Sequence, residues 1–161
     1  MINSKTYILS VDPGKATGVA WLTVKPDGPA EITYAYETTG SMNDTLKLWD
    51  EWLFDSRSPG ELIVLCENWI PMQTAFATNP ASAIEPMAWL KLLARQENIE
   101  METPNPQQRL AITDDAIKQA GYWQKGGAGH KRSAVRHGLC WVLRQNHLPT
   151  TELLYPRTDR P

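Results

Sequence analysis

Apolar residues recur along this chain with two different periods, which divide it into short strands and longer helices. Three runs rich in β-branched and aromatic residues occupy residues 6–12, 17–24 and 31–38. Short turns join these runs, so they predict an antiparallel meander. A fourth run, at 61–67, is continuously apolar in its interior, which is typical of a central strand covered on both faces.

Helical spacing of apolar residues accounts for most of the remaining chain. We expect a short strand at 99–103 and helices at 41–54, 81–97, 107–120 and 130–145. Proline is comfortable only in the first turn of a helix, so the helix that contains Pro86 can also begin later than residue 81. The order is β-β-β-α-β-α-β-α-α, and no repeat or linker divides it. It predicts an α/β fold with a five-stranded mixed sheet flanked by helices on both faces.

The length of 161 residues suits one domain with a substantial core, which we assign to residues 1–147. Residues 148–161 contain three prolines and no apolar period, so we expect a flexible or partner-bound tail. No apolar run approaches the about 20 residues of a membrane span, and the N-terminus does not resemble a secretion signal. The two cysteines lie in apolar segments, as reduced core residues do. We therefore expect a cytoplasmic protein with no membrane partner.

The net charge of −2 hides an uneven distribution along the chain. Residues 1–115 hold 16 acids and 8 lysines or arginines, whereas residues 116–151 hold six lysines or arginines, all three histidines and no acid. The basic segment lacks the acids at helical spacing that a solvated helix face usually carries. It indicates a local site for a polyanion, with a solvated helix face as the alternative.

Two of the expected central strands end in a carboxylate, Asp12 and Glu67. If these strands are parallel neighbours, both acids emerge at the same edge of the sheet, where α/β proteins usually bind ligands. Nearby carboxylates repel each other, and Mg²⁺ or Mn²⁺ between them relieves the repulsion. His130, Ser133 and His137 share one face of the last expected helix, so His130 can complete a three-ligand site.

Each of these residues also has a purely structural explanation. Asp12 can bond to the backbone of its own turn, Glu67 can pair with Lys15, and His130 can cap its helix. The three explanations together are less economical than one shared site.

Three motifs in this order resemble the small RuvC-like Holliday-junction resolvases, especially those of bacteriophages. They are VDPGKATGVAW at 11–21, LCEN at 65–68 and GHKRSAVRHGL at 129–139, and the resemblance covers about Tyr7 to Leu143. It implies an RNase H-like fold and a metal-dependent endonuclease that acts on branched DNA such as a four-way junction. It further implies a homodimer, no nucleotide cofactor, and a cytoplasmic location in a bacterial cell or, if a phage encodes the protein, in its host.

The resemblance also implies how the site is built. Two ions, Mg²⁺ or Mn²⁺, would be held by Asp12, which bridges them, by Glu67, and by His130 in the first ligand place of the last helix. The second place on that helix is an Asp in the family pattern and is Ser133 here, a far weaker ligand for a hard cation. The expected catalytic residues are therefore Asp12, Glu67, His130 and Ser133.

The serine leaves three explanations open. His130, Ser133 and water can suffice in this branch, an inactivating substitution can stand at this position, or the protein has lost cleavage and kept junction binding. The neighbouring Asp114–Asp115 pair on another expected helix is a further source of an acid.

The candidate DNA contacts come from the basic segment, from the first turn and from the stretch after Glu67. In related resolvases that stretch inserts an apolar side chain at the junction centre, although burial against a partner subunit is the alternative here. The candidates are Lys15, Trp69, Ile70, Met72, Phe76, Lys131, Arg132, Arg136 and His137.

Two other function classes remain as rivals. The first is a catalytically inactive junction-binding protein of the same fold. The second is a phosphotransferase of the actin and sugar-kinase type, which also opens with an Asp at a strand end and a Gly-containing turn. That family needs two such domains around its nucleotide, and this sequence has no Walker-type motif.

Overall fold

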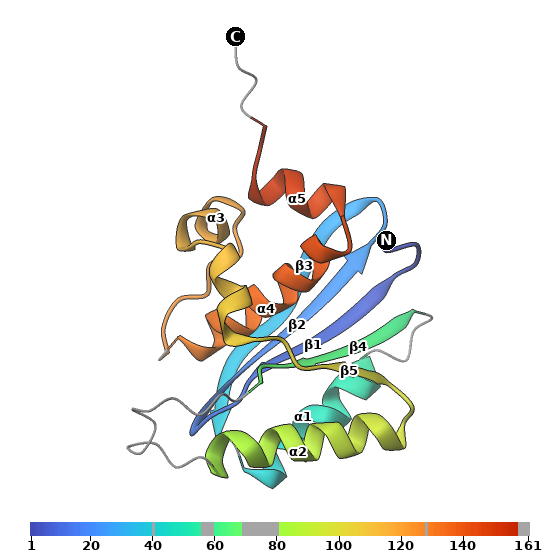
Figure 1. Ribbon diagram of the computed structural model, residues 1–161, viewed down its shortest axis with the longest axis vertical. Helices are drawn as coiled ribbons and strands as arrows, with labels where there is room; N and C mark the ends of the chain where they lie inside the picture. Colours follow the sequence, from blue (N-terminus) through green and yellow to red (C-terminus); the bar gives the residue numbers. More distant parts are fainter. Residues whose placement is uncertain (40, 56–59, 69–80, 128, 158–161) are drawn as a thin grey trace.

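Five strands of the computed structural model, which describes residues 1–39, 41–55, 60–68, 81–127 and 129–157, form one mixed sheet. The strands are β1 (Thr6–Asp12), β2 (Ala16–Lys25), β3 (Gly28–Thr39), β4 (Glu61–Cys66) and β5 (Glu100–Glu102). Their order across the sheet is β3-β2-β1-β4-β5 (Figure 1). Strand β2 is antiparallel to β1 and β3, while β1, β4 and β5 run parallel. The expected α/β fold with a five-stranded mixed sheet is confirmed.

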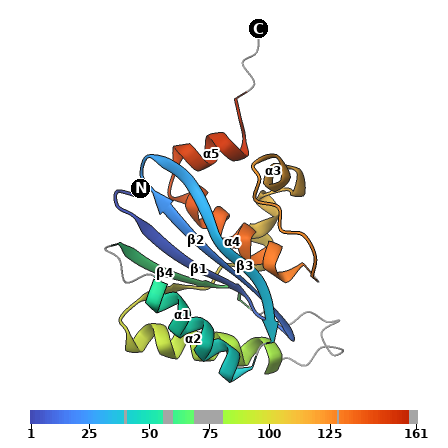
Figure 2. The same ribbon diagram turned by 180° about the vertical axis from the view of Figure 1, so that it is seen from behind.

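Helices cover both faces of this sheet (Figures 1 and 2). On one face, α1 (Met42–Asp55) and α2 (Ala81–Gln96) bury a core that includes Leu9 of β1. On the other face, α4 (His130–Arg144) buries a second core that includes Ile8. Each such fully buried aliphatic side chain stabilises the fold by about 1.5–3 kcal/mol. Burial on both faces explains why β1 and β4 are mostly apolar in their interiors.

The segment before the last long helix differs from the expectation of one helix over 107–120. It forms a 3₁₀ helix, η2 (Pro106–Ala111), and a short helix, α3 (Asp114–Gln119). Between them Ile112 is extended and buried, and the Thr113 hydroxyl caps α3 by accepting from the Ala116 N–H at 3.2 Å. Burying Ile112 requires a break in the helix, and Thr113 satisfies an amide that the break exposes.

Two other expectations about the helices are corrected. Helix α2 begins at Ala81, so Pro86 lies inside the helix and not in its first turn. The first half of the expected flexible tail is helix α5 (Leu148–Leu154). The Thr150 hydroxyl accepts from the Ala30 N–H at 2.9 Å, and His147 Nε2 lies 2.9 Å from the Lys25 carbonyl oxygen.

These contacts tie α5 to the β2–β3 hairpin. His147 Nδ1 also lies 2.8 Å from the Thr150 hydroxyl, so the imidazole donates to the carbonyl through Nε2 and accepts from the hydroxyl through Nδ1. The domain boundary at residue 147 itself stays a prediction. Among the described residues, no helix is long and apolar enough to cross a membrane.

Candidate active site

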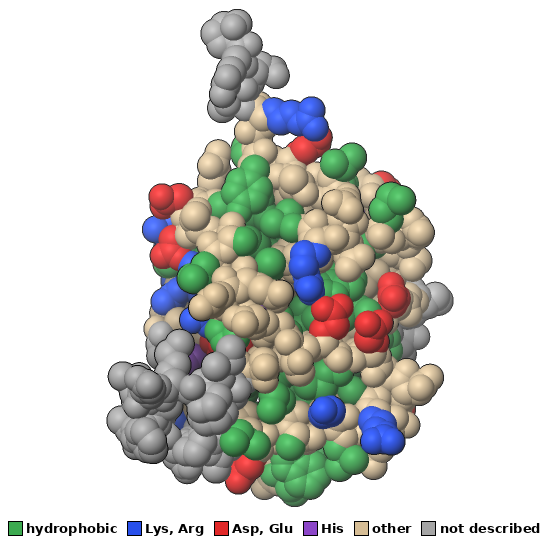
Figure 3. All heavy atoms as spheres, in the orientation of Figure 1, with side chains coloured by type: hydrophobic (Ala, Val, Ile, Leu, Met, Phe, Trp, Pro, Cys, Tyr) green, Lys and Arg blue, Asp and Glu red, His purple; other side chains and the backbone are tan. Residues whose placement is uncertain are grey.

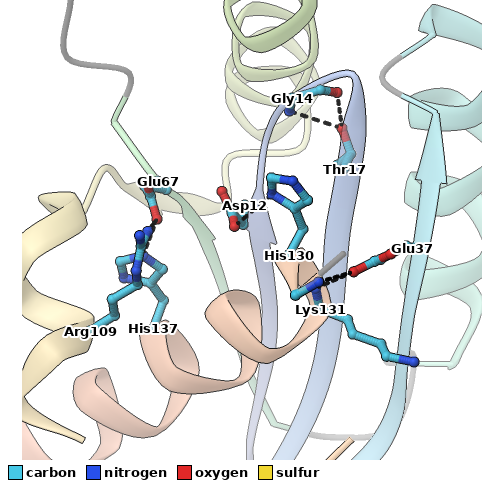
Figure 4. A network of polar contacts seen from close by, with 10 residues as sticks. Asp12, Gly14, Thr17, Glu37, Glu67, Arg109, His130, Lys131 and His137 are labelled. Carbon is cyan, nitrogen blue, oxygen red and sulfur yellow. Dashed lines mark hydrogen bonds and ion pairs between the residues drawn. The ribbon is translucent and has the colours of Figure 1, made fainter. Parts of the chain in front are cut away.

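Asp12 and Glu67 emerge together at one edge of the sheet (Figure 4). Strands β1 and β4 are parallel neighbours in which Val11 pairs with Cys66, and the Glu67 N–H donates to the Val11 carbonyl at 2.8 Å. Asp12 follows Val11 and Glu67 follows Cys66, so the two acids occupy matching positions at the ends of adjacent strands. The spacing of acids at strand ends predicted this placement correctly.

Asp12 does not close its own turn. Thr17 does so, because its hydroxyl donates to the Gly14 carbonyl at 2.8 Å and accepts from the Gly14 N–H at 3.2 Å. The Asp12 carboxylate instead lies 3.1 Å from Nδ1 of His130, the first residue of α4. This hydrogen bond raises the pKa of His130, outweighing the opposite effect of burial, and the charges of Asp12, Glu37 and Glu67 add to it.

Two residues that the local sequence did not single out hold the start of α4 in place. A Cβ atom on Gly18 of β2 would lie 2.0 Å from the carbonyl carbon of His130, so only glycine lets the helix start lie against this strand. The Glu37 carboxylate of β3 accepts from the Gly129 N–H at 2.9 Å and from the Lys131 N–H at 3.4 Å. Helix α4 has no side-chain cap at Gly129 and no acid in its first turn, so the Glu37 carboxylate supplies both the cap and the negative charge.

Glu67 makes two contacts through the same oxygen, Oε2. Arg109 of η2 donates to it through Nη1 at 2.7 Å, and His137 Nε2 lies 2.5 Å from it. Burial alone raises the pKa of the Glu67 carboxyl, but the hydrogen bond and charge of His137 and the charge of Arg109 outweigh it and hold the pKa below its usual value. Glu67 therefore pairs with Arg109, not with Lys15.

The expectation that His137 contacts DNA is wrong. Its side chain is 1% exposed because it lies under Glu67, within the packed face of α4. His137 shares a face of α4 with His130, as predicted. The end of this face that carries His137 is buried, so His137 contacts the Glu67 carboxylate and cannot reach a ligand.

An open cavity of about 520 Å³ lies above these groups. Its lining residues are Asp12, Glu67, Arg109, Leu110, Asp114, Gly129, His130, Arg132, Ser133 and Arg136. The cavity thus brings together all four expected catalytic residues. It adds Arg132 and Arg136 of α4, Arg109 of η2 and Asp114 of α3.

Asp114 and Arg136 form an ion pair on the wall of this cavity. Burial lowers the pKa of Arg136, and repulsion by the Arg109 guanidinium lowers it further, so the two cations influence each other. Of the two neighbouring acids, Asp114 lines the cavity beside Ser133, whereas Asp115 is almost fully exposed.

The other expected DNA contacts lie around the same site. Lys15 is exposed in the turn after β1, and the Lys131 ammonium donates to the Lys125 carbonyl at 2.5 Å. Arg132 donates to carbonyls of the glycine-rich loop and lies over the Trp123 ring, 4.9 Å from its centroid. In Figure 3, basic and acidic side chains lie side by side on the flank formed by α3 and the start of α4. The remaining candidates lie outside the described residues: Trp69, Ile70, Met72 and Phe76.

The types of donor in the cavity suit a hard divalent cation, but their arrangement in this conformation does not fit one. Among the described residues, no group of three His, Cys, Asp or Glu side chains is placed to hold a metal ion. The hydrogen bonds give the reason, since Asp12 contacts His130 while Glu67 contacts Arg109 and His137.

No protein-family model and no curated protein sequence matches the chain. Solved structures do match it. Thermus thermophilus RuvC in complex with a Holliday junction substrate aligns with a TM-score of 0.67 at 14% identity, over 88% of this chain and 95% of that one. A second structure of the same RuvC gives 0.60 at 14% identity, over 88% and 97% of the two chains.

The yeast mitochondrial Holliday junction resolvase Ydc2 aligns with a TM-score of 0.52 at 10% identity, over 99% of this chain and 84% of that one. At such identities the likeness concerns the fold. The matches cover 88–99% of this chain. The chain therefore has the RNase H-like fold of the RuvC resolvases.

Proposed function

We propose that the protein is a structure-selective endonuclease that hydrolyses phosphodiester bonds in branched DNA, with a four-way junction as its substrate. The observation that carries the proposal is the placement of Asp12 and Glu67 at the ends of adjacent parallel strands, with His130 against Asp12. This placement occurs on a fold shared with a RuvC that was solved in complex with a Holliday junction substrate.

The charges around the cavity suit phosphodiester hydrolysis. The lowered pKa of Glu67 keeps its carboxylate charged, and the raised pKa of His130 favours a protonated imidazole, which can donate to a phosphate oxygen as long as His130 holds no cation. The guanidinium groups of Arg109 and Arg136 can bind the non-bridging oxygens of the scissile phosphate.

We include a requirement for Mg²⁺ or Mn²⁺ in this proposal, with two ions in each active site. When bound, such ions supply Lewis-acid charge that favours attack by water and departure of the leaving oxygen. Asp12, Glu67 and His130 would hold them. Because these three side chains do not converge in the present conformation, the arrangement of Glu67 has to change first.

The rest of the proposed interface lies beside this cavity. Lys15, Lys131 and Arg132 would contact backbone phosphates, and the apolar residues at 69–76 would contact bases at the branch point. A homodimer would place two such sites on opposed strands, because a four-way junction and a two-fold dimer share the same symmetry.

The test is cleavage of a labelled synthetic four-way junction against a linear duplex of the same sequence, with Mg²⁺, Mn²⁺ or chelator. We expect paired nicks in the junction alone and only with metal. Asp12→Asn is the matched variant, and it should lower the cleavage rate at least about a hundredfold while junction binding stays within a few-fold. Tight junction binding by the unaltered protein without cutting in either metal would contradict the proposal and favour a non-catalytic junction-binding protein.

A further inference from the structure

Glu67 already has a positively charged partner inside the protein. Its Oε2 atom accepts from Arg109 Nη1 at 2.7 Å, and the two side chains are only 12% and 30% exposed. Water therefore screens this ion pair weakly compared with a pair on an open surface. Figure 4 shows the Arg109 side chain pointing toward the Glu67 carboxylate.

This contact has a direct consequence for cation binding. A carboxylate whose charge is balanced by a guanidinium group gains less from a divalent cation than an unpaired one does, because the two cations compete for the same oxygens. Arg109 and His137 both contact the Glu67 oxygen that a cation would need, and among the described residues Asp12, Glu67 and His130 do not converge on one point.

Arg109 is placed so that it can exchange partners. It lies on the short 3₁₀ helix η2 and lines the open cavity, where Arg136 repels it. Two guanidinium groups on one wall favour an anion between them, and a DNA phosphate has the geometry that guanidinium groups bind best. His137 is buried and also contacts Glu67, so it offers the carboxylate a second partner that does not depend on Arg109.

We propose that Arg109 competes with the cation for Glu67, and that a DNA phosphate relieves this competition by taking the guanidinium group. Cation and DNA then strengthen each other's binding, since each favours the arrangement in which Arg109 has left Glu67. This inference rests on the proposed function and concerns how the same site is switched on.

The first experiment measures Mn²⁺ binding without DNA, by electron paramagnetic resonance of free Mn²⁺. Arg109→Gln should bind Mn²⁺ about tenfold more tightly than the unaltered protein, the size expected when a charge-assisted hydrogen bond no longer competes. Arg136→Gln is the matched control, because it removes the same charge from the same cavity without touching Glu67. Its affinity for Mn²⁺ should rise by less than about threefold.

The second experiment measures the coupling itself, as the junction Kd with and without Ca²⁺, with intact DNA verified on a gel. Ca²⁺ should tighten junction binding severalfold for the unaltered protein and for Arg144→Gln, whose guanidinium group pairs with Glu102. This gain should disappear in Arg109→Gln. If Arg109→Gln does not fold, Arg109→Lys keeps the charge but loses the planar donor geometry, and an intermediate affinity for Mn²⁺ is then expected.

The outcomes separate this inference from the proposed function. If Arg109→Gln binds Mn²⁺ no more tightly than Arg136→Gln, competition at Glu67 is refuted, although junction cleavage by the unaltered protein can still stand. If the unaltered protein neither binds nor cuts a junction, the proposed function fails whatever the Mn²⁺ affinities are.

Discussion

At the scale of single residues, the contact between Asp12 and His130 joins positions 118 apart in the chain, and its strength depends on pH. Asp12 raises the pKa of His130 above the ordinary value of 6.5, so the folded protein binds this proton more tightly than the unfolded chain. The contact therefore stabilises the fold fully at pH values below 6.5 and ceases to do so as the pH rises through the raised pKa of His130.

We expect Asp12→Asn to lower the free energy of unfolding, relative to the unaltered protein, by more at pH 6 than at pH 9. The difference should be small because His130 is 38% exposed. Urea unfolding at both pH values measures it, with Asp27→Asn in the exposed β2–β3 turn as the control. An equal effect of Asp12→Asn at the two pH values would mean that the contact does not involve a charged imidazole.

Ser133 offers a second prediction at this scale. Its side chain lines the cavity together with Asp12, Glu67 and His130, at the place where the family pattern has an aspartate. A carboxylate there would add a hard oxygen ligand, so Ser133→Asp should tighten Mn²⁺ binding about tenfold and raise the rate of junction cleavage. Ser133→Asn introduces a side chain of nearly the same size as aspartate but without its charge. It should change neither the Mn²⁺ affinity nor the cleavage rate in this way. No gain for Ser133→Asp would indicate that His130 and Ser133 already form a competent arrangement.

At the scale of elements, the site depends on how closely α4 approaches the sheet. Adding a methyl group at Gly18 would bring it against the backbone of His130 and Lys131, which cannot move aside as a flexible side chain can. We expect Gly18→Ala to destabilise the protein by about 2 kcal/mol and to displace His130 from Asp12. Thermal unfolding and the imidazole NMR signals report the two effects.

Gly28, where the turn from β2 enters β3, provides the matched control in the same hairpin. A Cβ atom there meets nothing within 4 Å, so Gly28→Ala should leave stability and the imidazole signals unchanged. Equal stability of the two alanine variants would show that α4 does not lie as close to β2 as the structure places it.

The elements also show which parts of the fold can be predicted from local sequence. The strands and α4 were predicted to within about two residues at most ends, because each carries its own apolar period. The break at Ile112 was not predicted, because the buried surface against which this side chain packs comes from distant segments. Helix α5 was missed for the same reason, as the partner of Thr150 is the backbone of Ala30, 120 residues away.

The candidate site follows the same rule. Asp12 and Glu67 were predicted because an acid at the end of an apolar strand is a local pattern. Arg109 and Glu37 were not predicted, because each acts through a contact with a residue far along the chain. A lone charged residue in a short 3₁₀ helix or an edge strand carries no periodic signal.

At the scale of the whole molecule, the basic segment at 116–151 is less positive than its sequence indicates. It contains no acid, yet acids from outside it neutralise part of its charge. Arg136 pairs with Asp114, and Arg144 donates to Glu102 of β5 at 2.8 Å. The lysines and arginines of this segment that have no carboxylate partner among the described residues lie at the start of α4 and in the loop before it, next to the cavity, and there DNA does not have to displace an acid.

This distribution predicts which cations determine the salt dependence of DNA binding. Each phosphate contact contributes about 0.9 to the slope of log K against log salt for duplex DNA, because binding releases a counterion. Lys131→Ala removes a cation beside the cavity and should weaken junction binding and reduce the slope by about that amount. Arg144→Ala removes a cation of the same segment that already pairs with Glu102, and should leave the slope nearly unchanged. Junction titrations from low to physiological salt distinguish the two variants. An equal reduction of the slope for both would mean that DNA lies along the whole of α4, and that the basic residues of the segment exchange their carboxylate partners for phosphates.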